Sequence, residues 1–519
     1  MQIELKFSLS DEQLPILRRH RLLTQHAVSK SRAQRCGGVY FDTPDFLLKA
    51  HAVALHVARA GRSWRQTLTV NSAGTASIPP QREWTDDIRG AAPDFSAMAE
   101  LFEQEPELRR CRFDDSVFTR IVPIFTIDCR RTVWQLELEQ GREAELMLDT
   151  GEVLSGALRR PISTLTLAHR AGSADAFFDF ASALQRDLDL RVAYLAPTDI
   201  GYAMHDPMWG GAVTAQHLVL PADAQVGDGM RVIIRACLSH ILGNAAGVSQ
   251  GGELECIHQM RVGLRRLRSA LAIFEPLKAC PAHLQSELVW LSTELGRARD
   301  WDVLSTSTIP SLAADGIEVA DLAALQRRVQ QQAARAHRRA ARAVDSARAT
   351  RLWLRLEQWL YLPGAPDADG VAGQVEQIPA TLLIEFAEQN VAQFHRKMLA
   401  RSASMETAVP ESRHRLRIAA KKLRYATEFF LSYYRKKSTD RFLNKLADLQ
   451  DIFGASNDTV VADRLLRELA QKHPDLADGC ANIRNYLAEV DDKRLRRLGK
   501  RIRRFSVLKK LKLRDAAVV

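Results

Sequence analysis

Two segments of this sequence carry the same arrangement of histidine and basic residues. Residues 258–268 read H-Q-M-R-V-G-L-R-R-L-R, and residues 414–424 read H-R-L-R-I-A-A-K-K-L-R. In each, a histidine is followed by arginine at the third position, basic residues at the seventh and eighth, and arginine at the tenth. Guanidinium and ammonium groups bind phosphate oxygens through charge-assisted hydrogen bonds. The repeated pattern therefore predicts a site for a polyanion.

Helical spacing places most of these cations on one side of each segment. At about 100° per residue, the histidine and the third, seventh and tenth positions fall within roughly 80° of one another. Leu264 and Leu423 lie on the opposite sides, so each helix is expected to bury one face and present the cations on the other. The predicted binding residues are His258, Arg261, Arg265, Arg266 and Arg268 in the first copy, and His414, Arg417, Lys421, Lys422 and Arg424 in the second.

A solvated basic face is the simpler explanation for any one such helix. Like charges at these spacings repel one another, however, and neither row has interleaved carboxylates. Two matching rows without compensation indicate an external polyanion as the missing partner.

A second shared pattern follows each motif. Residues 295–303 and 453–460 each hold an apolar residue, a glycine and then an aspartate before a new apolar run. Glycine suits the end of a helix and aspartate suits the start of the next, so we expect a helix–turn–helix corner at both places. The repeat then predicts two duplicated helical units of about 150 residues each.

Two more basic stretches accompany the motifs. Residues 327–351 are rich in arginine and alanine and are expected to form one helix, whose arginine stripe either is exposed or lines the anion site. Residues 493–514 hold 12 basic residues and no acidic one, which predicts a solvated terminus or an extension of the anion path. The additional candidate anion contacts are Arg335, Arg339 and Arg342.

With its two histidine-plus-basic helices, the segment 218–510 resembles the CHAD domain, the conserved histidine α-helical domain. The resemblance implies two four-helix bundles related by pseudo-twofold symmetry. It also implies that the basic helices line a groove or pore that binds inorganic polyphosphate.

The first 205 residues follow a different pattern. Stretches such as Ile3–Phe7 and Trp134–Glu139 alternate polar and apolar residues, which predicts antiparallel strands. The segments Ile3–Phe7, Tyr40–Asp45 and Leu148–Val153 resemble the CYTH domain, the triphosphate tunnel metalloenzyme family. That resemblance implies an antiparallel β-tunnel with flanking helices, where glutamates bind Mg²⁺ or Mn²⁺ and basic residues hold a triphosphate for hydrolysis or transfer.

Several positions of that family's pattern carry other residues here. The opening E-x-E-x-K appears as Q-I-E-L-K at 2–6, the R-x-R falls on His56 and Ala58, and the late E-L-E-L-E strand reads T-L-T-L-A at 164–168. A hard divalent cation needs oxygen ligands, and most of those positions do not supply them. We therefore expect no assured metal site, Glu4 and Glu145 being a weak pair, and the sequence argues against an enzyme. The residual tunnel residues are Glu4, Lys6, Glu83, Arg131, Glu145 and Asp149.

The fold class expected overall is multidomain α+β. It comprises a CYTH-like antiparallel β-tunnel or barrel with flanking helices at 1–205, a linker at 206–228, an all-α pair of pseudo-symmetric four-helix bundles at 229–510, and a tail at 511–519. Charge divides in the same way. Residues 1–210 hold 25 Lys and Arg against 28 Asp and Glu, while the remainder holds 48 against 34. The excess of positive charge thus lies in the half that carries the repeated motif.

Cysteine spacing and hydropathy indicate the cellular compartment of the protein. The seven cysteines never show C-x-x-C spacing, which favours a reducing cytosol over a disulfide framework or a zinc site. No stretch approaches the roughly 18 uncharged apolar residues of a membrane span, and the N-terminus does not read as a signal peptide. We expect a cytoplasmic protein, with polyphosphate granules as a candidate location.

The leading hypothesis is an inorganic polyphosphate-binding protein, with tripolyphosphate as a further candidate ligand. One alternative is a metal-dependent inorganic triphosphatase in the first domain, and Mg²⁺ or Mn²⁺ is expected as cofactor only in that case. The other is a nucleic-acid-binding basic protein, although the motif helices lack interleaved aromatic residues apart from Tyr425. The sequence leaves the oligomeric state open.

Overall fold

The structure is a computed structural model of the whole chain. It divides into two compact units, residues 1–211 with 345–372, and residues 212–344 with 373–519. Gln2 and the segments 206–210 and 515–519 of the predicted linker and tail lie outside the described residues. The structure describes residues 3–71, 81–105, 108, 115–139, 141–172, 174–205, 211–317, 321–361, 381–405, 409–508 and 510–514.

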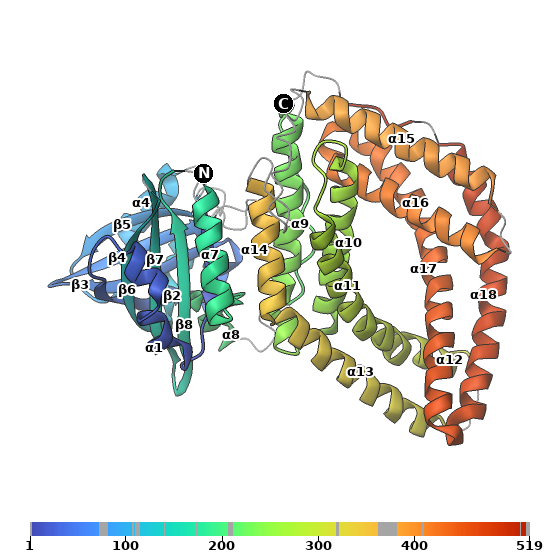
Figure 1. The fold of residues 1–519 in the computed structure, drawn as a ribbon, viewed down its shortest axis with the longest axis horizontal. Helices are drawn as coiled ribbons and strands as arrows, with labels where there is room; N and C mark the ends of the chain where they lie inside the picture. The colour runs from blue at the N-terminus through green and yellow to red at the C-terminus, as the bar shows by residue number, and fades with distance from the viewer. Residues whose placement is uncertain are drawn as a thin grey trace. The chain divides into compact units, whose positions relative to one another are not determined.

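An antiparallel sheet forms the N-terminal unit, as the alternating segments predict (Figure 1). Its described strands follow the order β5-β4-β3-β2-β6-β7-β8-β1-β9. The strands are β1 (Glu4–Ser8), β2 (Arg32–Asp42), β3 (Val53–Ala60), β4 (Ser63–Asn71), β5 (Gln81–Ile88), β6 (Val122–Glu139), β7 (Arg142–Ser155), β8 (Leu158–His169) and β9 (Arg191–Val192).

One face of this sheet is apolar and is covered by helices. Leu146 of β7 and Leu167 of β8 are buried in one cluster with Phe177 and Phe178 of α7 (Ala174–Leu188). A second cluster joins the apolar positions of β3 and β4 to α4 (Phe95–Gln104). Because side chains alternate along a strand, the intervening residues point to the other face, which carries the predicted tunnel residues. The short helices of this unit are α1 (Gln13–Arg18), α2 (Arg21–His26), α3 (Leu47–Ala50), α6 (Asp115–Thr119) and α8 (Pro197–Ala203).

A helix from the second half of the sequence completes this unit. The expected single helix over 327–351 is instead two helices, α13 (Leu322–Val344) and α14 (Ala347–Tyr361). The Ser346 hydroxyl accepts a hydrogen bond from the Ala349 N–H, so this serine caps the N-terminus of a separate helix, α14. α14 packs against α7, and its Leu354 is buried in the apolar cluster of that helix.

A disulfide joins two strands of the sheet. The absence of C-x-x-C spacing argues against a disulfide framework, yet Cys36 of β2 and Cys129 of β6 are bonded. The register explains the difference, because the two residues stand directly opposite each other in the antiparallel pair. Such a pairing depends on strand register, which the spacing of cysteines along the chain does not reveal. The other described cysteines are buried and form no disulfide.

The C-terminal unit consists of two groups of four helices, which confirms the predicted pair of bundles (Figure 1). Among the described residues, α9, α10, α11 and α13 contact one another in a closed ring, and so do α15, α16, α17 and α18. The rings meet through α10 with α16 and α11 with α17. Their bounds are α9 (Val226–Ser249), α10 (Leu254–Phe274), α11 (Ala282–Val303), α15 (Leu383–Ala403), α16 (Pro410–Phe429), α17 (Lys436–Lys472) and α18 (Ala477–Ser506).

Short elements join these helices. The π-helix η1 (Leu304–Thr308) and α12 (Ile309–Ala314) follow α11, and the 3₁₀ turns η2 (Leu431–Tyr433) and η3 (Pro474–Leu476) flank α17. The two expected helix corners are absent. Residues 295–303 lie inside α11 and residues 453–460 inside α17, both of which run through these segments without a turn.

One described helix, α9, is long and apolar enough by length and composition to cross a membrane. It contacts α10 and α13, and side chains such as Ile233 and Ile241 are buried within the unit. Its packing against α10 is close, because a β-carbon on Gly263 would lie 2.7 Å from the Ile241 side chain. Packing in the bundle interior accounts for the apolar character of α9.

Candidate functional site

The two motif helices bring their basic rows together. α10 and α16 contact each other. Arg261 and Arg265 of α10 act electrostatically on Lys421 of α16, and Arg265 acts on Arg417 as well. The rows therefore converge on one region, and we call Arg261, Arg265, Arg417 and Lys421 the cationic cluster.

The cluster contains buried donors that lack an acceptor among the described residues. The Nε atoms of Arg265 and Arg417 are buried and have no hydrogen-bond partner within the described part of the chain. A buried guanidinium donor without an acceptor costs free energy. Burial, reinforced by Arg265, Arg417 and Arg261, lowers the pKa of the Lys421 ammonium to about 7. An entering anion would supply acceptors and offset this repulsion.

His258 lies at the edge of the cluster. Burial lowers the pKa of its imidazole, and Arg299 of α11, Arg265 and Arg261 lower it further, while Glu255 opposes them. The ligand-free site therefore favours the neutral imidazole, and a bound polyanion would favour its charged form. His414 of the second copy is exposed.

Two aspartates enter the region from α11 and α17. The Asp300 carboxylate lies 3.6 Å from Arg261 Nη1 and accepts a hydrogen bond from Arg464 Nη2 at 3.1 Å. Burial raises the pKa of the Asp458 carboxyl, whereas Arg299 and Arg417 oppose the rise. The local sequence pattern predicts a helix cap at each aspartate, which is wrong because both lie inside helices, and it does not indicate Arg299 or Arg464 as neighbours. The available signal was the equivalent place of the two aspartates after the two motifs.

Two predicted members of the rows face a carboxylate instead of an open site. Arg266 is 7% exposed, and its Nη1 donates to Glu428 at 2.7 Å while its guanidinium lies 4.9 Å from the Phe429 ring centre. Arg424 donates to the same glutamate at 2.7 Å. The structure thus differs from the predicted rows here, because Glu428 neutralises both arginines between α10 and α16.

The remaining candidates are exposed. Arg268 and Lys422 lie at the surface of the two motif helices. On α13, Arg339 pairs with Glu294, while Arg335 and Arg342 are exposed. None of these five is among the charges that shift the pKa values of Lys421, Arg417 or His258. Their predicted role as phosphate contacts stays a prediction.

The predicted tunnel residues gather on one face of the N-terminal sheet. The Arg131 guanidinium donates hydrogen bonds to both carboxylate oxygens of Asp149 at 2.7 Å. It also interacts electrostatically with Glu145 and Glu4. Burial and the charge of Glu83 raise the pKa of Tyr40 to about 12, and Arg131 opposes the rise. Lys6, by contrast, is exposed on β1.

These carboxylates do not fit a divalent cation. Glu4 and Glu145 flank Ala168 of β8 from the two neighbouring strands. Glu145 accepts hydrogen bonds from Gln135 and Arg170, and Asp149 is occupied by Arg131. No group of three His, Cys, Asp or Glu side chains in the described residues could hold a metal ion. Hydrogen bonds from Arg131, Arg170 and Gln135 already occupy oxygens of Asp149 and Glu145 that Mg²⁺ or Mn²⁺ would need.

Where the CYTH family pattern has its R-x-R pair, on β3, this chain has His56 in a stack of aromatic rings. Tyr40 stacks on His56 with ring centres 5.1 Å apart and on Phe125 with ring centres 4.9 Å apart. Burial lowers the pKa of His56, which favours its neutral form. This part of the face therefore offers little positive charge to a triphosphate.

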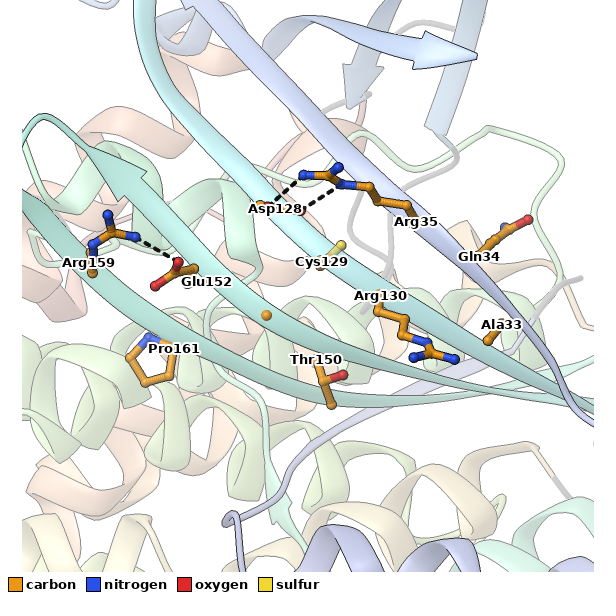
Figure 2. Close-up of a pocket in the computed structure, with 11 residues that line it drawn as sticks. Ala33, Gln34, Arg35, Asp128, Cys129, Arg130, Thr150, Glu152, Arg159 and Pro161 are labelled. Atoms are coloured by element: carbon orange, nitrogen blue, oxygen red, sulfur yellow. Dashed lines mark hydrogen bonds and ion pairs between the residues drawn. The ribbon is translucent and has the colours of Figure 1, made fainter. Parts of the chain in front are cut away.

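A shallow depression lies on the opposite face of the same strands (Figure 2). Arg35 pairs with Asp128 and Arg159 with Glu152 along its walls. Arg130 also lines it, and strand alternation directs this residue away from the face that holds Arg131. The depression is therefore separate from the tunnel residues.

Comparisons with known proteins agree with these two units. The CYTH domain family matches residues 1–188, and the CHAD domain family matches residues 232–467. The chain is a CYTH–CHAD protein. The crystal structure of the CHAD domain from the plant Ricinus communis is 39% identical, with a TM-score of 0.52, and the match covers 59% of this chain and 99% of that one.

The CYTH domain also resembles a curated protein. The inorganic triphosphatase of Haemophilus influenzae is 24% identical over 209 residues, which is 39% of this chain and 54% of that protein. The CYTH–CHAD chain thus spans about half the length of this relative. The match shows similarity to a protein named as an inorganic triphosphatase, and it does not by itself assign that activity to this chain.

Proposed function

We propose that the CHAD domain of this protein binds inorganic polyphosphate through the cationic cluster. The observation that supports this most is the pair of buried, unsatisfied Nε donors on Arg265 and Arg417 beside Lys421. Polyphosphate carries about one negative charge per phosphate and presents oxygen acceptors along its whole length. It could therefore satisfy donors from both motif helices at once.

The surroundings of the cluster favour a phosphate chain over a nucleic acid. Tyr425 directly follows the second motif and is only 8% exposed, so it presents no open ring for base stacking. Contacts would then be made to phosphate alone. A linear phosphate polymer suits this set of donors better than a base-bearing strand.

Direct titration of the full chain with long-chain polyphosphate tests the proposal. Four cations in the cluster lead us to expect log Kd to rise with log salt at a slope of about 3. Orthophosphate should compete weakly, because it cannot reach both helices. If duplex DNA at equal phosphate concentration displaces the polymer as well as unlabelled polyphosphate does, the site is a general polyanion surface and the proposal fails.

Polyphosphate binding should weaken as the pH rises from 6 to 8. Lys421, with a pKa of about 7 in the free protein, faces Arg261 and Arg265 of α10, Arg417 of its own helix and Asp458 of α17. A bound polyanion favours the charged ammonium, so the affinity is expected to fall about tenfold over this range. The pH dependence of Kd measures this effect.

Lys421→Arg provides the control for the pH effect, because a guanidinium stays charged throughout this range. The variant should bind with a flatter pH profile. An unchanged profile would assign the proton to another group, such as His258.

The comparisons favour a second candidate, a triphosphatase in the CYTH domain, more directly than they favour polyphosphate binding. The relative from Haemophilus influenzae is an inorganic triphosphatase. The tunnel residues of this chain do come together around Arg131. The occupied carboxylates and the aromatic wall are the opposing observations.

A phosphate-release assay with tripolyphosphate decides the second candidate. If the CYTH domain hydrolyses it, release by the full chain should require Mg²⁺ or Mn²⁺, and Arg131→Ala should lower it about 100-fold by removing a central cation. Arg159→Ala, which removes an arginine that pairs with Glu152 on the opposite face of the sheet, is the comparison variant. Release no faster than in protein-free buffer rejects this candidate and leaves polyphosphate binding untouched.

A further inference from the structure

The proposed polyphosphate site contains two carboxylates, which an anion-binding site would not be expected to need. We propose that Asp300 and Asp458 are resident counter-anions of the cationic cluster and that polyphosphate replaces these two carboxylates when it binds. This inference rests on the proposed polyphosphate-binding function. The two aspartates would then be functional members of the site whose effect opposes that of the arginines.

The two aspartates occupy equivalent places in the repeat. Asp300 lies on α11, the helix after the first motif helix, and Asp458 lies on α17, the helix after the second. Each acts on the arginine three positions after the motif histidine. Asp300 lies 3.6 Å from Arg261, and Asp458 interacts electrostatically with Arg417. The same pairing therefore recurs in both bundles.

A second, crossed set of interactions joins the bundles. Arg464 of α17 donates to Asp300 of α11 at 3.1 Å, while Arg299 of α11 interacts with Asp458 of α17. In both α11 and α17, therefore, an aspartate interacts with the motif arginine of its own bundle. An arginine of the same helix interacts with the aspartate of the other helix. The aspartates lie at the contact between the bundles, beside the cluster itself.

The placement implies opposite effects on folding and on binding. Without a ligand, the carboxylates offset repulsion among the clustered cations and so stabilise the fold. When a phosphate chain approaches the same cations, the carboxylates repel it, and their interactions with the arginines must be given up. Removing their charge should therefore destabilise the free protein and tighten polymer binding.

The test uses Asp300→Asn and Asp458→Asn in the full chain, alone and together. Each single change should tighten long-chain polyphosphate binding about three- to tenfold, the size of a partly screened charge interaction. Each should also lower the melting temperature of the free protein, and saturating polyphosphate should restore it by mass action.

Asp463→Asn is the matched control. Asp463 is also on α17, but it pairs with Arg467 and Arg484 and is not among the charges acting on Lys421 or Arg417. Its replacement removes the same charge and should leave polymer affinity unchanged within about twofold.

Weaker binding in the Asp300→Asn and Asp458→Asn variants would show that the aspartates position the arginines, and unchanged binding would show that they take no part. Either result overturns the inference while the polyphosphate site stands. A wild-type chain that binds no polymer overturns the site itself, and this inference with it.

Discussion

Replacing Arg265 and Arg417 together by glutamate is expected to weaken polyphosphate binding by at least about 100-fold, because truncating one member of a buried charge pair at an interface already costs about 2–5 kcal/mol. The double variant reverses one charge on each motif helix and places both carboxylates beside Lys421. It also removes the two buried Nε donors that lack acceptors. Binding of labelled long-chain polyphosphate at fixed salt and pH measures the loss.

The fold should tolerate this change. Arg266 and Arg424, which pair with Glu428 between α10 and α16, are untouched. The new carboxylates also relieve repulsion inside the cluster. An unchanged helical circular dichroism spectrum, together with a melting temperature no lower than that of the wild type, would separate lost binding from lost structure.

The control is Arg268→Glu combined with Lys422→Glu. These residues lie on the same two helices and undergo the same charge reversal, but both are exposed. We expect a loss of only about threefold, through the general field of the basic surface. An equal loss in the control pair would mean that the whole basic surface holds the polymer and that the cluster has no special role.

The two basic rows could be predicted from helical spacing, and the resemblance to the CHAD domain implied that they line one site, whereas the counter-charges could not be predicted. Helical spacing places Arg261 and Arg265 on one face of a single helix, and the repeat doubles that face. Glu428, however, lies beyond the motif and meets Arg266 only because α10 packs on α16. Pairings between helices depend on crossing geometry, which periodicity within one helix does not contain.

The aspartates show a different limit. A glycine followed by an aspartate reads locally as the end of one helix and the start of another. Gly296 instead lies within α11, where its carbonyl accepts a hydrogen bond from Arg261 Nη1 at 3.2 Å. Tertiary packing overrides the local signal, and the residues that were expected to form a turn become part of the site.

The tunnel was predicted with mixed success for a related reason. The resemblance to the CYTH domain implied that Glu4, Arg131, Glu145 and Asp149 belong to one tunnel, and in the structure Arg131 pairs with Asp149 and interacts electrostatically with Glu145 and Glu4. The resemblance could not show that Arg131 and Arg170 already occupy the carboxylates. Side chains on neighbouring strands decide this, and their register is set by the folded sheet.

Deleting α14 is expected to prevent stable folding of the CYTH domain. The sequence assigns residues 345–361 to the basic second half, yet α14 packs on α7 and belongs to the N-terminal compact unit. Leu354 is 3% exposed in the same apolar cluster as Phe177 and Phe178, and the Tyr361 ring lies 5.8 Å from the ring of Phe178. A fragment ending at residue 205 would leave this apolar surface of α7 in water.

Thermal and urea unfolding can quantify this dependence. Leu354→Ala in the full chain should lower the free energy of unfolding of the N-terminal unit by about 2–4 kcal/mol, as expected for a buried leucine. Arg355→Ala, exposed on the same helix, should change it by no more than about 0.5 kcal/mol. The fragment 1–205 should melt without a cooperative transition, and joining residues 345–361 to it through a flexible linker should restore one. A fragment 1–205 that unfolds cooperatively near the temperature of the full chain would show that the CYTH domain is complete without α14, and that the helix only rests on its surface.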